Sequence, residues 1–283
     1  LGILSRCVPM LLALAACDAA ERKLPFEVAP GVRQVGRLSD RRITESSGVV
    51  ASRTHTNLFW THNDGGGPAK QLLFAIHRAG DTLAAFPVQG AEFVDWEDIG
   101  IDESGRLYLA DIGNNNATRH DIAVYQVDEP DPKAGGRPVP IKRQWRLQYP
   151  DRPFDAESLF VWNGRGYIVS KVVNDAHAQI FGFPLADSKA PLRLELVATT
   201  KVDSPVSGAD LSPDGRLLAL VAKNGAYLFR IDGDVSRATK GKSPTTRFRH
   251  ESIEGCCFVP EGLLDTSEKR EVFLFTDPAF RWK

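Results

Sequence analysis

One unit of sequence recurs five times along most of this 283-residue chain, and the repeat limits the possible folds more than any other feature. Each copy has an acidic or hydroxyl residue, a short apolar run, a polar turn and a second apolar run. The copies begin at Glu45, Glu97, Glu157, Ser207 and Glu254. A period of about 40–50 residues, with several short strands in each copy, is typical of β-propellers. We therefore predict an all-β, five-bladed β-propeller.

Turn sequences separate the apolar runs of the central copies, as expected for hairpins. These turns are Asp102–Gly105, Trp162–Gly166 and Ser212–Gly215. The strands predicted after them are Arg106–Ala110, Tyr167–Val169 and Leu217–Val221. Residues 24–38 are expected to supply an outer strand that closes the ring with the last copy. Two stacked all-β domains are the alternative, and the even spacing of the copies favours one closed ring.

The first sixteen residues contain one positive charge, then an apolar stretch, then small residues, which is the pattern of a secretory signal. The segment ends in Leu14-Ala15-Ala16-Cys17, which resembles the bacterial lipobox, in which the cysteine is lipidated. The resemblance implies a signal peptide at residues 1–16, a tether at 17–30 and the propeller at 31–283. We expect anchoring to the membrane through Cys17 and a place in the bacterial cell envelope.

Composition narrows the choice of partners. Lys and Arg number 35 and Asp and Glu 36, for a net charge of -1, so no basic excess favours a nucleic-acid partner. The adjacent pair Cys256-Cys257 fits neither a disulfide framework nor zinc-ligand spacing. We expect one of these two cysteines to fill the core and the other to pack between strands.

The repeat starts are predicted to meet at one mouth of the central channel, because the first strand of each propeller blade lines that channel. Two carboxylates about 6 Å apart at an effective dielectric near 20 repel by roughly 3 kcal/mol. Several must therefore be protonated, or a cation must lie among them. Oxygen-only donors in a wide ring favour Ca²⁺. The alternative is that these acids only close blades through hydrogen bonds to backbone amides.

The order of these residues resembles the central Ca²⁺ site of the calcium-activated nucleotidases, or apyrases, which are five-bladed propellers. The resemblance implies a Ca²⁺ ligand set of Thr44, Glu45, Glu97, Glu157, Ser207 and Glu254. Thr44-Glu45 stands where that family has a Ser-Asp pair. The segments around Trp60, Trp96 and Ile112 are more similar to uncharacterised secreted bacterial propellers, so nucleotidase activity does not follow from the ring.

Antiparallel pairing is expected to bring the end of each second strand back to the same mouth. By that count the neighbours of the five starts are Asp64, Asp111, Lys171, Lys223 and Asp277. His62, Asn63 and Asn114 join them, and together with Lys171 and Lys223 they are the predicted ligand-binding residues. The two lysines would either contact a small anionic ligand or neutralise surplus carboxylates.

Two functions fit this arrangement. The first is a Ca²⁺-dependent hydrolase of phosphate esters or anhydrides, in which Asp64, Asp111 or Glu97 activates water. The second is a non-catalytic envelope lipoprotein that binds a ligand or a protein. The chain has no serine-hydrolase elbow and no zinc-protease motif. The fold alone does not choose between the two functions.

Overall fold

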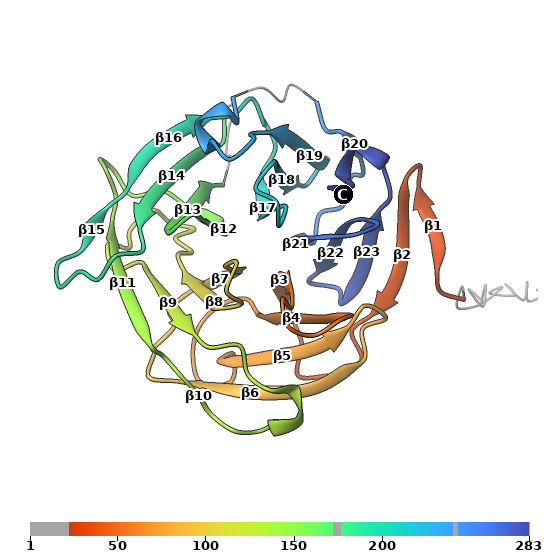
Figure 1. Cartoon of the computed structure of the whole chain (residues 1–283), viewed down its shortest axis with the longest axis horizontal. Coiled ribbons are helices and arrows are strands. Elements are labelled where there is room, and N and C mark those ends of the chain that lie inside the picture. The colour runs from red at the N-terminus through yellow and green to blue at the C-terminus, as the bar shows by residue number, and fades with distance from the viewer. Residues whose placement is uncertain (1–22, 172–176, 240–242, 283) are drawn as a thin grey trace, which may run out of the picture.

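The computed structural model describes residues 23–171, 177–239 and 243–282, so the predicted signal peptide and Cys17 lie outside the described residues. Five sheets surround one axis and form a five-bladed β-propeller (Figure 1). The predicted fold is confirmed, and the chain is one closed ring rather than two stacked domains. Within the described ranges, the helical segments are three short 3-10 turns, η1 (Pro132–Ala134), η2 (Val235–Arg237) and η3 (Pro278–Phe280).

Each blade contains four or five strands, and the strands of each blade are given below in order from the axis outward. Blade one has β3 (Ser46–Ala51), β4 (Leu58–Asn63), β5 (Leu72–His77), β6 (Thr82–Gln89) and β10 (Val139–Pro140). Blade two has β7 (Trp96–Ile101), β8 (Leu107–Asp111), β9 (Ala123–Val127), β11 (Arg143–Gln148) and β15 (Leu192–Arg193). Blade three has β12 (Ala156–Trp162), β13 (Arg165–Ser170), β14 (Gln179–Pro184) and β16 (Glu195–Thr199). Blade four has β17 (Val206–Leu211), β18 (Leu217–Ala222), β19 (Gly225–Arg230) and β20 (Thr246–Arg247). Blade five has β21 (Ile253–Val259), β22 (Gly262–Ser267), β23 (Glu271–Phe275), β2 (Val32–Arg37) and β1 (Phe26–Ala29).

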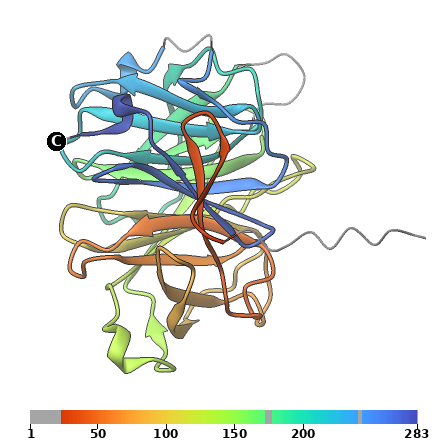
Figure 2. The ribbon, with the colours of Figure 1, turned by 90° about the vertical axis from the view of Figure 1, so that its right-hand side faces the viewer.

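Blade five contains strands from both ends of the chain. Strand β2 pairs antiparallel with β23, with Val32 opposite Phe275 and Arg37 opposite Glu271. Figure 2 shows β1 and β2 lying along the outer side of this blade. The predicted closure by residues 24–38 is therefore confirmed. The sheet begins at Phe26, so the last residues of the predicted 17–30 tether form strand β1 and not a linker.

The core is divided among the five interfaces between blades. One cluster of buried apolar side chains fills each interface, because alternate residues of a strand point to opposite faces of its sheet. Cys256 packs toward blade four and Cys257 toward blade one, and both thiols are buried and free. The expected burial of this pair is confirmed, and both thiols, rather than one, lie in core clusters. No helix among the described residues is long and apolar enough to cross a membrane.

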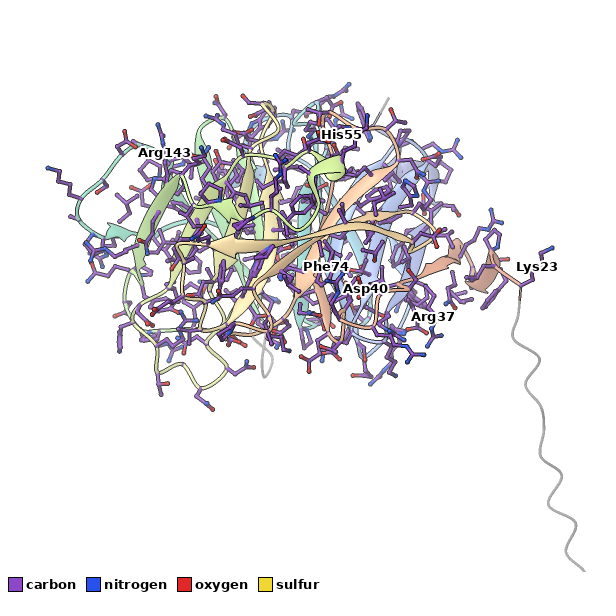
Figure 3. The ribbon with its side chains drawn as sticks, turned by 90° about the horizontal axis from the view of Figure 1, so that it is seen from below. Lys23, Arg37, Asp40, His55, Phe74 and Arg143 are labelled. Carbon is purple, nitrogen blue, oxygen red and sulfur yellow. The ribbon has the colours of Figure 1, made fainter. Side chains whose placement is uncertain are left out.

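The ring has two mouths that differ in which parts of the inner strands surround them. We call the end where β3, β7, β12, β17 and β21 begin the acidic mouth. The opposite end, where each inner strand turns into the second strand of its blade, is the hairpin mouth. Figure 3 shows the ring from its side, with His55 of the β3–β4 hairpin at one face and Arg37, in the closing strand, lower in the view.

Candidate functional site at the acidic mouth

The inner strands share one irregularity near their first residues. In every blade the pairing of the first and second strands shifts register just after the inner strand begins. The second residues of the inner strands lie in these β-bulges, and they are Ser47, Glu97, Glu157, Ser207 and Glu254. A β-bulge changes the direction of the side chain at that point and is common beside functional sites.

Glu45 was predicted to be the blade-one equivalent of Glu97. In the structure that position is occupied by Ser47, the second residue of β3. The backbone N–H of Asp64 donates to the Glu45 carbonyl (2.8 Å), as that of Lys171 donates to Asp155 (2.9 Å). Glu45 is therefore equivalent to Asp95 and Asp155, two residues before each bulge. Its side chain is 49% exposed and pairs with Lys70.

The densest group of carboxylates spans blades one and two. Asp64, Asp95 and Glu97 each place a carboxylate oxygen within 4.8 Å of the others. Gly113 makes room for this group, because a Cβ there would collide with Glu97 Oε1 and with the Asp95 carboxylate. The sequence prediction included Asp64 and Glu97 and missed Asp95. A signal for Asp95 exists, since the pattern Asp-x-Glu occurs in blade two (95–97) and again in blade three (155–157).

Burial and mutual repulsion raise the pKa values of these acids. Burial, followed by the charge of Asp95, raises the pKa of Asp64 to about 6. Burial also raises the pKa of Glu97 well above its ordinary value, and Asp64 and Asp95 add to the shift. Across the mouth, burial and the nearby Glu268 raise the pKa of Glu254 to about 8. The mouth therefore holds more carboxylates than it can keep ionised near neutral pH.

Lys171 interacts with carboxylates from several blades at the acidic mouth. Its ammonium pairs with Glu157 and lies 3.7 Å from the Asp155 carboxylate. Its positive charge also opposes the rise in the pKa values of Glu97 and Glu254. The predicted proximity of Lys171 and Glu157 is present in the structure. Lys223 lies nearer to blade five, where its charge opposes the pKa rise of Glu254.

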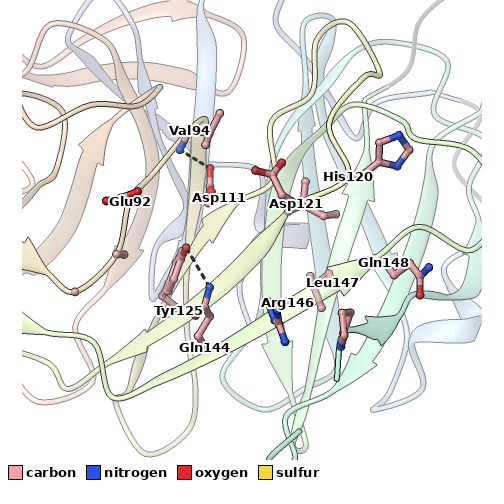
Figure 4. A pocket seen from close by; sticks show the side chains of 14 residues that line it. Glu92, Val94, Asp111, His120, Asp121, Tyr125, Gln144, Arg146, Leu147 and Gln148 are labelled. Atoms are coloured by element: carbon pink, nitrogen blue, oxygen red, sulfur yellow. Dashed lines mark hydrogen bonds between the residues drawn. The ribbon is translucent and has the colours of Figure 1, made fainter. Parts of the chain in front are cut away.

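Asp111 has a structural role, which distinguishes it from the other two candidate bases. One carboxylate oxygen accepts hydrogen bonds from the backbone N–H groups of Val94 (3.1 Å) and Asp95 (2.7 Å). Arg119 donates to the other oxygen at 3.0 Å. Figure 4 shows the bond from Val94 beside a cavity of about 580 Å³ that opens on the side of the ring among β9, β11 and residues 90–94.

Asn63 has the same role in blade one as Asp111 has in blade two. Its side-chain oxygen accepts from the backbone N–H groups of Thr44 (2.8 Å) and Glu45 (3.2 Å). Thr44 itself is exposed. Asn114 also supports the backbone, because its side-chain oxygen accepts from the N–H groups of residues 118 and 119. These polar side chains shape the loops of the mouth.

His62 and Ser207 are enclosed. The His62 ring is fully buried and stacks on Trp96 with ring centres 4.0 Å apart, and burial lowers its pKa to about 3. His62 is thus a neutral core residue. Ser207 is 2% exposed, and its hydroxyl has no hydrogen-bond partner among the described residues.

In blade five, Glu268 occupies the place predicted for Asp277. Strand β22 pairs Ser267 with Ile253, and the Glu268 N–H donates to the Ser252 carbonyl at 3.0 Å. Asp277 instead caps the turn η3, where it accepts from the N–H of Ala279. The error arose because the prediction took the last apolar run of the chain, β23, as the partner of β21.

Comparisons with known proteins identify no family for this chain. No protein-family model matches the chain, and no curated protein matches it. A gluconolactonase from Xanthomonas campestris is similar at a TM-score of 0.49 and 12% identity, over 86% of this chain and 88% of that chain. A chain of a nidogen/laminin complex has a TM-score of 0.47 and 11% identity, with 78% and 72% covered. A chain of Kuenenia stuttgartiensis hydrazine synthase has a TM-score of 0.44 and 11% identity, with 83% and 72% covered. At these values the likeness carries no functional assignment.

Proposed function

We propose that the acidic mouth binds a divalent cation, for which Ca²⁺ is the best fit, and that the cation-loaded mouth hydrolyses phosphate esters or anhydrides. The observation that carries the proposal is the group of three carboxylates, Asp64, Asp95 and Glu97, within 4.8 Å of one another. Three such groups held together without a cation repel one another and lose charge.

The donor set fits a hard cation. All the donors are oxygens, and Asp64 Oδ1 is buried with no hydrogen-bond partner among the described residues. The Ser207 hydroxyl is unpartnered in the same way. Because Ca²⁺ takes about 6–8 oxygen ligands in irregular geometry, it suits this mouth better than Mg²⁺ does. Asp64, Asp95 and Glu97 would hold the ion. Glu157 is balanced by Lys171, which removes it from the ligands implied by the apyrase resemblance.

The proposal of phosphate hydrolysis depends on positive charges at the mouth that could contact an anionic substrate. A bound Ca²⁺ would supply Lewis-acid polarisation of a phosphoryl oxygen. Lys223 makes no side-chain ion pair among the described residues, so its ammonium is available to contact phosphate oxygens. With a pKa near 8, the Glu254 carboxyl can take up and release a proton near neutral pH. Asp111 is set aside as a base because its oxygens are engaged.

The test is a metal analysis of the purified protein, followed by assays with p-nitrophenyl phosphate and ATP, each with added Ca²⁺ and with chelator. We expect about one Ca²⁺ per chain and activity that chelator removes. Asp95→Asn should weaken Ca²⁺ binding at least about tenfold. The matched control is Asp187→Asn, which changes an acid that is 83% exposed on the outer side of the ring. Equal Ca²⁺ affinity in both variants would contradict the proposed site.

The second function, a non-catalytic binding module, is favoured by the engagement of Asp111 and the burial of His62. His62 was predicted to contact a substrate and Asp111 to activate water, and neither presents a free side chain to the mouth. A protein that binds Ca²⁺ through Asp95 but hydrolyses neither substrate would support this function over the hydrolase.

We also propose export and lipid anchoring, on the sequence of residues 14–17. Cys17→Ala should abolish labelling of the protein by a radioactive fatty acid and release it from the membrane fraction of a bacterial host. Unchanged labelling of Cys17→Ala would contradict this proposal.

A further inference from the structure

The hairpin mouth contains a second concave site, separate from the acidic carboxylates. A cavity of about 550 Å³ lies between the loops of blades one and five, and a smaller one of about 120 Å³ extends toward blades two, three and four. Arg53 and Pro213 line both. A volume of about 300–1,000 Å³ is usual for sites that bind small molecules.

The larger cavity has an apolar wall and a cationic rim. Trp282, Pro213 and Pro260 contribute its accessible apolar surface, and the almost fully buried Phe59 and Phe258 also line it. Arg53 and Arg78 lie at the rim. The site therefore offers a surface for an apolar group and, beside it, guanidinium groups that suit an oxyanion.

The two arginines differ in how they are neutralised. Arg78 is engaged, because its Nη2 lies 2.8 Å from Glu261 Oε2. Arg53 is only partly exposed, and its guanidinium makes no hydrogen bond or ion pair with any described residue. A partly buried guanidinium that makes no hydrogen bond is costly, so an anion that reached it would be bound favourably.

Carboxylates on the neighbouring hairpins have other partners. Glu129 accepts from the indole N–H of Trp60 (2.7 Å) and from the Thr54 hydroxyl (2.8 Å). Glu103 accepts from the backbone N–H of Asn163 at 3.3 Å. Asp210, whose charge interacts with that of Arg53, is buried and accepts from the Phe258 N–H at 2.7 Å. The charge of Arg53 is thus left to face the cavity.

We propose that the hairpin mouth binds a small amphiphilic anion, with its oxyanion head on Arg53 and its apolar body in the larger cavity against Trp282, Pro213 and Pro260. The planar fork of a guanidinium matches both carboxylate and phosphate heads. This site is independent of the cation proposed for the other mouth, because it shares no residue with it.

The probe for this site is anilinonaphthalene sulfonate, an anionic aromatic dye whose fluorescence rises on binding. Phenylnaphthylamine, a neutral analogue, is the matched probe without the charge. Arg53→Gln should weaken binding of the anionic dye about tenfold or more and leave that of the neutral dye unchanged. Arg143→Gln, which alters an arginine that is 46% exposed on β11, should change neither. Equal binding of the anionic dye by the wild type and Arg53→Gln would overturn the proposal.

Competition identifies the ligand class and guards against a misfolded variant. Octanoate and octyl phosphate should displace the anionic dye from the wild-type protein, and octanol should do so far less effectively. Arg53→Lys keeps the charge without the fork and should bind the dye more tightly than Arg53→Gln does. Octanol that displaces the dye as well as octanoate would show that the anion is not recognised, which would also overturn the proposal.

Discussion

The two mouths of the ring lie at opposite ends of the same five inner strands, yet they differ in charge and in how that charge is balanced. At the acidic mouth, Asp64, Glu97 and Glu254 crowd together and lose charge through raised pKa values. At the hairpin mouth, the guanidinium of Arg53 makes no hydrogen bond or ion pair with any described residue. The crowded carboxylates therefore support our proposal of a cation at the first mouth, and Arg53 supports our proposal of an anion at the second.

The contrast has a backbone origin. At the acidic mouth a β-bulge in every blade sets the side chains that surround the axis, so the same position recurs five times. The hairpin mouth has loops of unequal length, from the short Asn163-Gly164 turn to the longer loop that carries Arg53. Its chemistry comes from one loop. The β-bulge common to all blades thus places polar side chains around the whole acidic mouth, and the unequal loops place the pocket on one side of the hairpin mouth.

The largest expected difference between the mouths is in their response to pH without metal. The pKa of Glu254 is raised to about 8 and that of Asp64 to about 6, so the folded protein binds more protons than the unfolded chain above about pH 4. Stability should be greatest at the acidic end and should fall, by on the order of a few kcal/mol, as pH rises through 6 and 8. Melting curves in chelator from pH 5 to 9 test this prediction. A melting temperature that does not change with pH would contradict the repulsion among these carboxylates.

The second prediction concerns Ca²⁺ and the acidic mouth alone. At a hundredfold excess over Kd, a ligand that binds only the folded state stabilises it by about 2.7 kcal/mol. In a chain of this size the melting temperature should rise by roughly 5–10 °C. The gain should be larger at pH 8 than at pH 5, because protons compete with the cation for the carboxylates. Thermal melts with Ca²⁺ and with chelator measure both effects, and a wild-type curve that ignores both additions would end the cation proposal.

The third prediction separates two acids within the acidic mouth. Glu157 pairs with the partly buried Lys171, so Glu157→Gln should destabilise the metal-free protein by about 1–3 kcal/mol. Glu97 lies among like charges, so Glu97→Gln should leave the metal-free protein as stable or more stable at pH 8, and it should abolish the Ca²⁺ response. Denaturant unfolding of both variants in chelator decides the matter. The reverse order of stabilities would show that Glu157, not Glu97, is the crowded acid.

The smallest expected effect is the influence of one mouth on the other. Inner strands of about six residues separate the two sites by roughly 16–20 Å, beyond the distance at which stability effects usually couple. Arg53→Gln should therefore leave the Ca²⁺-induced shift in melting temperature unchanged within about 1 °C. Asp95→Asn should likewise leave dye binding unchanged. A double variant whose effects do not add would show that the mouths communicate.

The ring and its closure were predictable because both follow from apolar patterns that recur along the chain. Which residues occupy equivalent positions at the acidic mouth was less predictable. A β-bulge is invisible in the alternation of apolar and polar residues, so Glu45 was aligned with Glu97 when Ser47 is the true counterpart. Distinguishing a base from a support was beyond the sequence, since it does not show that Asp111 is the counterpart of Asn63 while Asp64 lies one position later.

The strand that closes the ring has a consequence for synthesis and assembly. Residues 26–37 are synthesised well before their partner β23, so the arm waits with an unpaired edge while the intervening blades form. Pairing across nearly the whole chain also makes this contact slow to form. An arm that waits in this way can pair with β23 of a second molecule as well as with its own. The closing strand is thus the point at which this ring is most exposed to domain swapping in crowded, newly made protein.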